Sequence, residues 1–280
     1  MINVTQMENQ VLFDECTKKM SDFFRTKGFI EVHAQSHLSI LAACEDPYTV
    51  ATFEYNDETW PLPQTNQMNL ENILLKNPNY HGVFCQTTSY RNEPNPIEGR
   101  HEKIFPMFEF ECAGTITDLL ELEKDLLSYL GFDAPVEFKY EELCEKYNTP
   151  ILNSDHEIKM MGDFGHAVSL QYFPERTSPF WNMKHNELDI FNKVDVILFG
   201  QETIGSAERS VNPEEMKYYF ETISDGGYAK KLFELFGEDR VRKELGDFLN
   251  LNFFPRFGGG IGMTRMIRAM GMLKNDMAII

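Results

Sequence analysis

The feature that most constrains the fold is a pair of extended segments, 82–91 and 105–111, joined by a polar loop. The loop holds Pro94, Pro96 and Gly99, and because proline lacks a backbone N–H, these residues disfavour a helix. We therefore predict a β-hairpin. Alternate side chains of a strand share one face. The residues predicted to share the polar face are Arg91, Glu93, Phe105, Met107, Glu109 and Glu111.

This predicted face has the chemistry of a nucleotide site. A planar guanidinium suits a phosphate, an aromatic ring stacks on a purine, and carboxylates hold metal ions or ammonium groups. A second segment, 258–262, is rich in glycine and is followed by Arg265. We expect it to form a turn that enters a helix, where glycine permits close backbone approach to a ligand. An ion pair on an ordinary hairpin and a glycine turn without a ligand remain the simpler alternatives.

The order of these signals resembles motifs 2 and 3 of the class II aminoacyl-tRNA synthetases. The pattern is Arg-x-Glu, a loop, Phe-x-x-x-Glu and a distant Gly-x-Gly-x-Gly-x-x-Arg. Segments 64–67, 179–183 and 195–209 resemble further signatures of the aspartyl/asparaginyl branch, and the resemblance extends over about 23–270. It implies an α+β fold, with an antiparallel β-sheet flanked by helices.

The resemblance implies ATP and Mg²⁺ as cofactors. Arg91 would hold the α-phosphate, and Phe105 and Arg265 would enclose the adenine, which Glu93 would contact. Asp195 and Glu202 would hold the metal, as hard carboxylate oxygens do. The catalytic residues implied are Arg91, Glu202 and Arg265. The full set implied for ATP is Arg91, Glu93, Arg100, His101, Phe105, Asp195, Glu202, Gly260, Gly262 and Arg265.

The amino-acid site implied by the resemblance contains Gln67, Arg91, Glu109 and Arg209. The aspartate enzymes carry a lysine at the position of Leu70, and the asparagine enzymes carry Glu at position 109. A substrate carboxylate beside Glu109 without that lysine would suffer repulsion and desolvation. We therefore expect asparagine or a close neutral analogue. The spacing of Asp195 and Glu202 instead resembles the aspartate enzymes.

Three departures from the family pattern affect the expected partners. Gln35 replaces the proline of motif 1, the motif that builds the dimer contact in this family, so the expected homodimer contact is less secure. Residues 206–208 differ from the usual Gly-Ser-Gln, which affects the expected shape of the amino-acid pocket. The motif 1 helix begins near Met1. We therefore expect a stand-alone paralogue of asparaginyl-tRNA synthetase without an anticodon-binding domain.

Composition limits the remaining partners and the location. The net charge of −18 opposes a sequence-independent grip on RNA, so we expect tRNA binding to be uncertain and at most weak. The five cysteines lack a Cys-x-x-Cys pair and indicate reduced thiols. No segment has the pattern of a leader peptide or a membrane span, which favours a cytoplasmic protein without a membrane partner.

The 280 residues suit one catalytic domain, 1–280, with a possible insertion or lid at about 132–163. Capping signals predict helices that start at Thr5, Asp118 and Asn212. His33 and His37 lie in a β-rich segment, so we interpret them as structural rather than as a metal pair. The other predicted elements are strands at 29–33, 167–173 and 190–199, and helices at 70–76 and 141–147.

We therefore predict an AMP-forming ligase that converts an amino acid and ATP to an aminoacyl adenylate and passes the acyl group to an unidentified acceptor. Catalysis would depend on positioning and charge stabilisation. The alternatives are an ammonia-dependent asparagine synthetase, an asparaginyl-tRNA ligase, and an inactive domain that senses a ligand.

Overall fold

The computed structural model describes residues 10–33, 38, 47–98, 100–186 and 189–279. Its helices are α1 (Gln10–Thr26), α2 (Gln67–Lys76), α3 (Ile116–Leu130), α4 (Tyr140–Tyr147), α5 (Ser154–Phe164), α6 (Pro213–Thr222), α7 (Gly227–Phe236), α8 (Glu238–Leu249) and α9 (Met263–Ile279). Its strands are β1 (Phe29–Glu31), β2 (Ala51–Tyr55), β3 (Glu58–Leu62), β4 (Gly82–Tyr90), β5 (Ile104–Ala113), β6 (Val136–Lys139), β7 (Ala167–Pro174), β8 (Ile190–Leu198), β9 (Gln201–Glu208) and β10 (Arg256–Gly262). Short 3₁₀ helices are η2 (Pro47–Thr49), η3 (Glu175–Thr177) and η4 (Ile223–Gly226).

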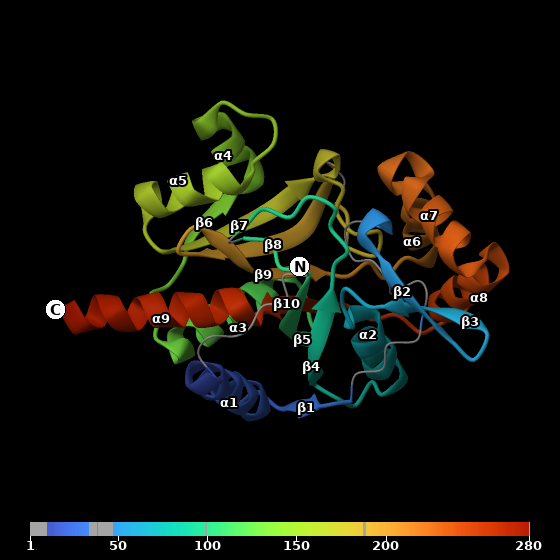
Figure 1. Cartoon of the computed structure of the whole chain (residues 1–280), viewed down its shortest axis with the longest axis horizontal. Helices are drawn as coiled ribbons and strands as arrows, with labels where there is room; N and C mark the ends of the chain where they lie inside the picture. Colours follow the sequence, from blue (N-terminus) through green and yellow to red (C-terminus); the bar gives the residue numbers. More distant parts are fainter. Residues whose placement is uncertain (1–9, 34–37, 39–46, 99, 187–188, 280) are drawn as a thin grey trace.

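Eight of the described strands form one sheet in the order β1-β4-β5-β10-β9-β8-β7-β6. The edge pairs β1–β4 and β6–β7 are parallel, and the other neighbours are antiparallel. Helices lie on both faces of this sheet (Figure 1). The predicted α+β fold is confirmed, and β4 and β5 form the predicted hairpin.

The alternation of side chains along β8 separates the two faces of the sheet. Val194, Val196 and Leu198 belong to the main apolar cluster, which α1, α3 and α9 also enter. Figure 1 shows these three helices together on one side of the sheet. Lys193 and Asp195 occupy the alternate positions, so they point to the opposite face. The candidate site lies on that opposite face.

The glycine-rich segment is a strand rather than the predicted turn. It forms β10, in the middle of the sheet between β5 and β9. A Cβ added at Gly258 would lie 1.8 Å from Oε2 of Glu111, and one at Gly259 would lie 2.6 Å from Cβ of Ser206. Glycine is therefore needed because side chains from the two neighbouring strands occupy the space beside β10.

The predicted helix signals have mixed outcomes. Asn212 caps α6 as predicted, because its side chain accepts hydrogen bonds from the backbone N–H groups of Glu214 and Glu215. The predicted start of α3 at Asp118 is wrong. Thr115 is the N-cap residue, and Asp118 accepts the Thr115 backbone N–H at 2.7 Å. The cap signal at Thr5, the substitution at Gln35 and the second histidine of the predicted pair, His37, lie outside the described residues.

The predicted insertion, 132–163, contributes β6 to the edge of the sheet and forms α4 and α5, of which α5 was not predicted.

The cysteines that the structure describes are buried and form no disulfide. Burial raises the pKa of Cys16 to about 12. No described helix has the length and apolar character required to cross a bilayer.

Candidate active site

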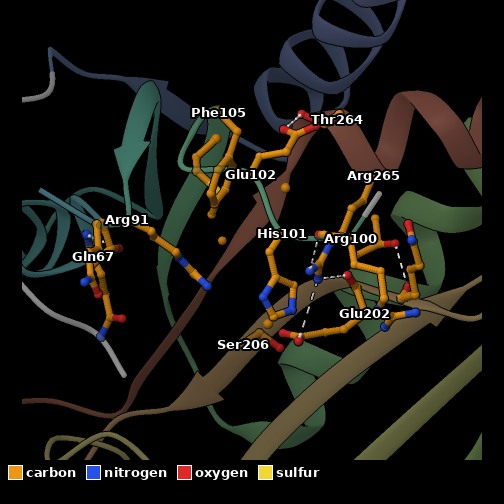
Figure 2. A pocket seen from close by; sticks show the side chains of 18 of the residues that line it. Gln67, Arg91, Arg100, His101, Glu102, Phe105, Glu202, Ser206, Thr264 and Arg265 are labelled. Carbon is orange, nitrogen blue, oxygen red and sulfur yellow. Dashed lines mark hydrogen bonds and ion pairs between the residues drawn. The ribbon is translucent and has the colours of Figure 1, made fainter. Parts of the chain in front are cut away.

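A cavity of about 400 Å³ lies against the sheet face opposite α1, α3 and α9, and most of the predicted site residues line it (Figure 2). The structure brings together residues from the hairpin, α2, β9, β10 and α9. The predicted residues in its wall are Gln67, Arg91, Glu93, Arg100, His101, Phe105, Glu202, Arg209, Gly260, Gly262 and Arg265. Asp195 and Glu109 are not part of this wall.

The hairpin supplies one side of the cavity. The Arg91 guanidinium carbon lies 5.4 Å from the centre of the Phe105 ring. The Arg91 N–H donates to the Lys103 carbonyl at 2.7 Å, which continues the pairing of β4 and β5 towards the loop. Beyond it, Nδ1 of His101 lies 2.8 Å from a carboxylate oxygen of Glu93. The loop therefore folds back, so that Glu93 and His101 line the cavity.

Arginines from the loop and from α9 form the opposite side (Figure 2). Arg265 donates to the backbone carbonyl of Glu202 at 2.5 Å and to that of Arg100 at 3.3 Å. Arg268 lies one turn further along α9 and also lines the cavity. Burial lowers the pKa of Arg268, and the Arg100 and Arg265 guanidiniums lower it further. This positive end of the cavity suits a polyanion such as a triphosphate.

Glu202 and Asp195 come together over Gly205. A Cβ added at Gly205 would lie 3.0 Å from Oε1 of Glu202 and 3.8 Å from Oδ1 of Asp195, so both carboxylates border the space left by the missing side chain. No cluster of three or more His, Cys, Asp or Glu ligands occurs among the described residues. Two carboxylates suit Mg²⁺, which usually takes its other ligands from phosphates and water.

A buried charge network lies beside the cavity wall at Gln67 and Arg209. Arg209 is 1% exposed, and its Nε and Nη2 donate to the two carboxylate oxygens of Glu111 at 3.1 and 3.2 Å. Glu71 accepts from Arg256 at 2.6 and 2.9 Å and from Gln67 at 2.9 Å. Two arginines and two carboxylates are therefore balanced without solvent, and each is held by hydrogen bonds on fixed strands and helices.

The pKa values of the two carboxyl groups in this network shift in opposite directions. Burial raises the pKa of Glu111 to about 7, although Arg209 opposes the shift. Burial also disfavours the charge of Glu71, but Arg256 and Arg209 together hold the pKa of Glu71 below its usual value. Glu71 therefore stays charged near neutral pH, and Glu111 can gain a proton just below neutral pH.

Glu109 and Leu70 lie away from the cavity. Glu109 is 1% exposed and accepts hydrogen bonds from the Thr65 hydroxyl, the Asn66 N–H at 3.0 Å and the Thr87 hydroxyl at 3.1 Å. Burial raises the pKa of Glu109. Leu70 packs in an apolar cluster with Leu74 and Val83. Glu109 therefore supports Thr65, which lines the cavity, and is not itself part of the wall.

Sequence reasoning missed several cavity residues. Lys193 lines the wall, and its Nζ lies 2.8 Å from Oδ2 of Asp195. The predicted strand 190–199 could have indicated it, because Lys193 precedes Asp195 by two residues and alternate side chains of a strand share one face. Arg268, which lines the cavity, and Glu71, which accepts a hydrogen bond from the cavity residue Gln67, had signals as well. Arg268 follows Arg265 by three residues on α9, and Glu71 follows Gln67 by four on α2, which are spacings that share a helix face.

The sheet, the arginines on two sides of the cavity and the glycine strand beneath it define a ligase domain of the class II aminoacyl-tRNA synthetase type. The family model described as tRNA synthetases class II (D, K and N) matches residues 3–277. The chain belongs to this family.

The chain is similar both to proteins named as aspartate enzymes and to proteins named as asparagine enzymes. The aspartate–tRNA(Asp) ligase of Thermococcus kodakarensis is 23% identical over 85% of the chain and 66% of that protein. An asparaginyl-tRNA synthetase from Pyrococcus horikoshii, solved with asparaginyl-adenylate, has a TM-score of 0.77 at 18% identity, over 92% of the chain and 64% of its own. An aspartyl-tRNA synthetase from Entamoeba histolytica has a TM-score of 0.68 at 16% identity, over 93% and 55%. The chain thus spans about two thirds or less of these proteins, and its similarity to the solved structures shows the fold.

Proposed function

We propose that the chain activates an amino acid with ATP. The α-carboxylate attacks the α-phosphate, which gives an aminoacyl adenylate and releases pyrophosphate, and the acyl group then passes to an acceptor. One observation carries this proposal: a single cavity collects Arg91, Phe105, Glu202 and Arg265 from distant parts of the chain. Such a set suits charge stabilisation and positioning, without a covalent nucleophile from the protein.

In this proposal ATP lies between the hairpin and α9. Adenine stacks on Phe105 and is covered by Arg265, because ring faces and planar guanidiniums stack well. Arg91 holds the α-phosphate and the amino-acid carboxylate. Arg100, His101 and Arg268 line the same cavity, so their charges can hold the outer phosphates.

Mg²⁺ fits the carboxylates of Asp195 and Glu202, whose oxygens border the space above Gly205. When bound, the metal neutralises phosphate charge as pyrophosphate leaves. Lys193 donates to Asp195 at 2.8 Å and holds that carboxylate in place. In this proposal β8 and β9 hold the Asp195 and Glu202 carboxylates next to the phosphates.

We further propose asparagine, or a close neutral analogue, as the amino acid. Gln67 and Arg209 line the cavity and can contact the α-amino group and the side-chain carbonyl oxygen. The charge of Arg209 is already balanced by Glu111, and Glu71 lies 3.8 Å from it. An added substrate carboxylate would find little uncompensated positive charge there, whereas a neutral amide needs only a donor.

Aspartate is the second candidate because Lys193 lines the same cavity. It lies on a different element from Leu70, and its ammonium group could be shared between Asp195, 2.8 Å away, and the additional carboxylate of aspartate. If the side-chain carboxylate of aspartate attacks the α-phosphate, and ammonia then bonds to that acyl carbon as AMP leaves, the enzyme is an ammonia-dependent asparagine synthetase. Lys193→Met separates the two candidates by KM: loss of the contact with Asp195 lowers kcat for either amino acid, but the variant should raise the KM for aspartate at least tenfold and leave the KM for asparagine within a few-fold of the parent.

Amino-acid-dependent exchange of pyrophosphate into ATP, measured across the standard amino acids, tests the proposal. Arg91→Ala should reduce exchange about a hundredfold, since loss of one preorganised donor costs roughly 3 kcal/mol. Arg242→Ala on α8, outside the cavity, is the control and should match the parent. A folded Arg91→Ala protein with near-parental exchange would show that the site is assigned wrongly.

The remaining proposals follow the family. We propose that two copies of the chain form a homodimer and that it acts in the cytoplasm as one catalytic domain, with α4 and α5 as an inserted cover. Analytical ultracentrifugation at low micromolar concentration tests the dimer, which a single monomeric species would contradict.

A further inference from the structure

Glu71 of α2 is a buried acid that has no direct part in the proposed activation step. It is 0% exposed and does not line the cavity. Its two oxygens have different partners. Oε2 accepts from Nε and Nη2 of Arg256 at 2.9 and 2.6 Å, whereas Oε1 accepts from Nε2 of Gln67 at 2.9 Å and from Nδ2 of Asn182 at 2.6 Å. The carboxylate is therefore anchored to β10 on one side and holds two side-chain amides on the other.

These contacts decide which end of the Gln67 amide faces the cavity. Although burial disfavours its charge, Arg256 and Arg209 lower the pKa of Glu71, so the carboxylate is ionised and can only accept hydrogen bonds. Gln67 must therefore turn its NH₂ group to Glu71, and Oδ1 of the fully buried Asn182 lies 3.4 Å from the same nitrogen. The nitrogen and oxygen of a planar amide point apart, so Oε1 points toward the cavity that Gln67 lines.

An oxygen at this point of the wall suits an ammonium group. Arg91 and Arg209 line the same cavity, and arginine offers only donors, so the amino group of a substrate needs an acceptor from another residue. The charge of Glu71 also polarises the Gln67 amide, which strengthens Oε1 as an acceptor. With the amide reversed, the NH₂ group of Gln67 would face the ammonium group, and two donors would oppose each other.

We propose that Glu71 is a positioning residue for the α-amino group of the substrate: it holds the Gln67 amide in the one orientation that accepts an ammonium group. The inference rests on the proposed amino-acid activation and deepens it. Glu71 acts through Gln67 and does not touch the substrate. Because the contact concerns the α-amino group, it applies equally to asparagine and to aspartate.

Pyrophosphate exchange with a pair of ligands tests this inference. The first ligand is the amino acid that the parent activates. The second is its counterpart without the amino group, succinamate for asparagine or succinate for aspartate, measured as a competitive inhibitor. In Glu71→Gln the new side chain accepts from Arg256 and turns its own NH₂ group to Gln67, so the Gln67 amide should reverse. The KM for the amino acid should rise roughly tenfold or more. The kcat should stay within about threefold of the parent and the Ki of the counterpart within about twofold, because neither depends on the amino group.

Further variants separate positioning from general damage to the site. Gln67→Leu should raise the KM for the amino acid about as much as Glu71→Gln, and the double variant should raise it no further, because Glu71 acts only through Gln67. Glu71→Asp keeps the charge that balances Arg256 and replaces Glu71→Gln if that variant does not fold. Its shorter side chain withdraws from Gln67, so the same KM should rise roughly threefold at an unchanged Ki. Lys76→Gln changes an exposed charge on the same helix and should match the parent.

Thermal unfolding identifies the variants that fold. An unchanged KM in a folded Glu71 variant, an equal increase in KM and Ki, or additive effects in the double variant would each overturn the inference. A parent without exchange for any amino acid would instead refute the proposed activation itself.

Discussion

At the residue scale, a buried carboxyl group makes the free energy of unfolding depend on pH. Glu123 of α3 is 2% exposed, accepts the Ser206 hydroxyl at 2.6 Å, and has a second oxygen with no hydrogen-bond partner among the described residues. Burial raises the pKa of Glu123 to about 8. Since the folded state binds this proton more tightly than the unfolded state, its contribution to stability falls as pH rises from about 4.5 to 8.

Glu123→Gln should therefore leave stability near pH 5 almost unchanged and increase it at pH 9 by a few kcal/mol. Glutamine keeps an oxygen for the Ser206 hydroxyl and carries no charge. Urea unfolding at the two pH values measures the effect, with the exposed Glu121→Gln on the same helix as control. Equal gains for the two variants, or no gain at pH 9, would contradict the assigned cause.

Phe105→Ala should weaken the binding of both ATP and GTP by about 1 to 3 kcal/mol, because stacking on an aromatic ring does not distinguish purines. Isothermal titration with each nucleotide measures this. Phe53→Ala on β2 is the control, since that ring is 42% exposed and lies outside the cavity. Unchanged nucleotide affinity in Phe105→Ala would remove the ring from the site.

At the scale of elements, local patterns predicted the hairpin, the α6 cap and most strands, whereas pairing between distant segments decided the rest. The run Gly258 to Gly262 has the local signature of a turn, yet it forms a strand because β5 and β9 supply its partners from far away in the sequence. The same limit applies to the site. Strand alternation predicts the shared face of Arg91 and Phe105, and it equally places Lys193 on the face of Asp195. That β8 and the hairpin border one cavity depends on the strand order, which local sequence does not contain.

The tight packing of β10 gives a testable contrast between two glycines of one strand. Gly258→Ala places a Cβ in the position of the Glu111 carboxylate and should destabilise the fold by about 3 kcal/mol or more, since Glu111 must leave Arg209. Gly262→Ala meets nothing closer than 3.9 Å and should keep nearly the parental Tm. Thermal unfolding compares them, and a similar Tm for both would refute the packing argument.

At the scale of the whole molecule, the net charge of −18 coexists with a strongly cationic cavity end. The arginines there are enclosed by sheet, loop and α9, so their field acts on a small anion inside the cavity rather than on an extended polyanion. A small nucleotide and a long RNA should therefore respond differently to this protein.

We expect no saturable binding of a mixed tRNA pool by the chain at about 0.15 M salt below about 100 µM protein, because non-specific RNA binding needs many exposed cations. ATP binding should persist under the same conditions. Fluorescence anisotropy of labelled tRNA is the measurement. Micromolar affinity that falls steeply with added salt would reveal a basic surface that the charge balance does not predict.

The position of β10 also has a consequence for synthesis of the chain on the ribosome. β10 lies between β5 and β9 and joins them in one sheet, and it is the last strand of the sheet in sequence. Until residues 256–262 are made, the earlier strands form two separate half-sheets, each with an open edge. Likewise, Arg256, the buried hydrogen-bond donor to the Glu71 carboxylate, is synthesised 185 residues after Glu71. Nascent chains that stall before β10 should thus be prone to aggregation and dependent on chaperones.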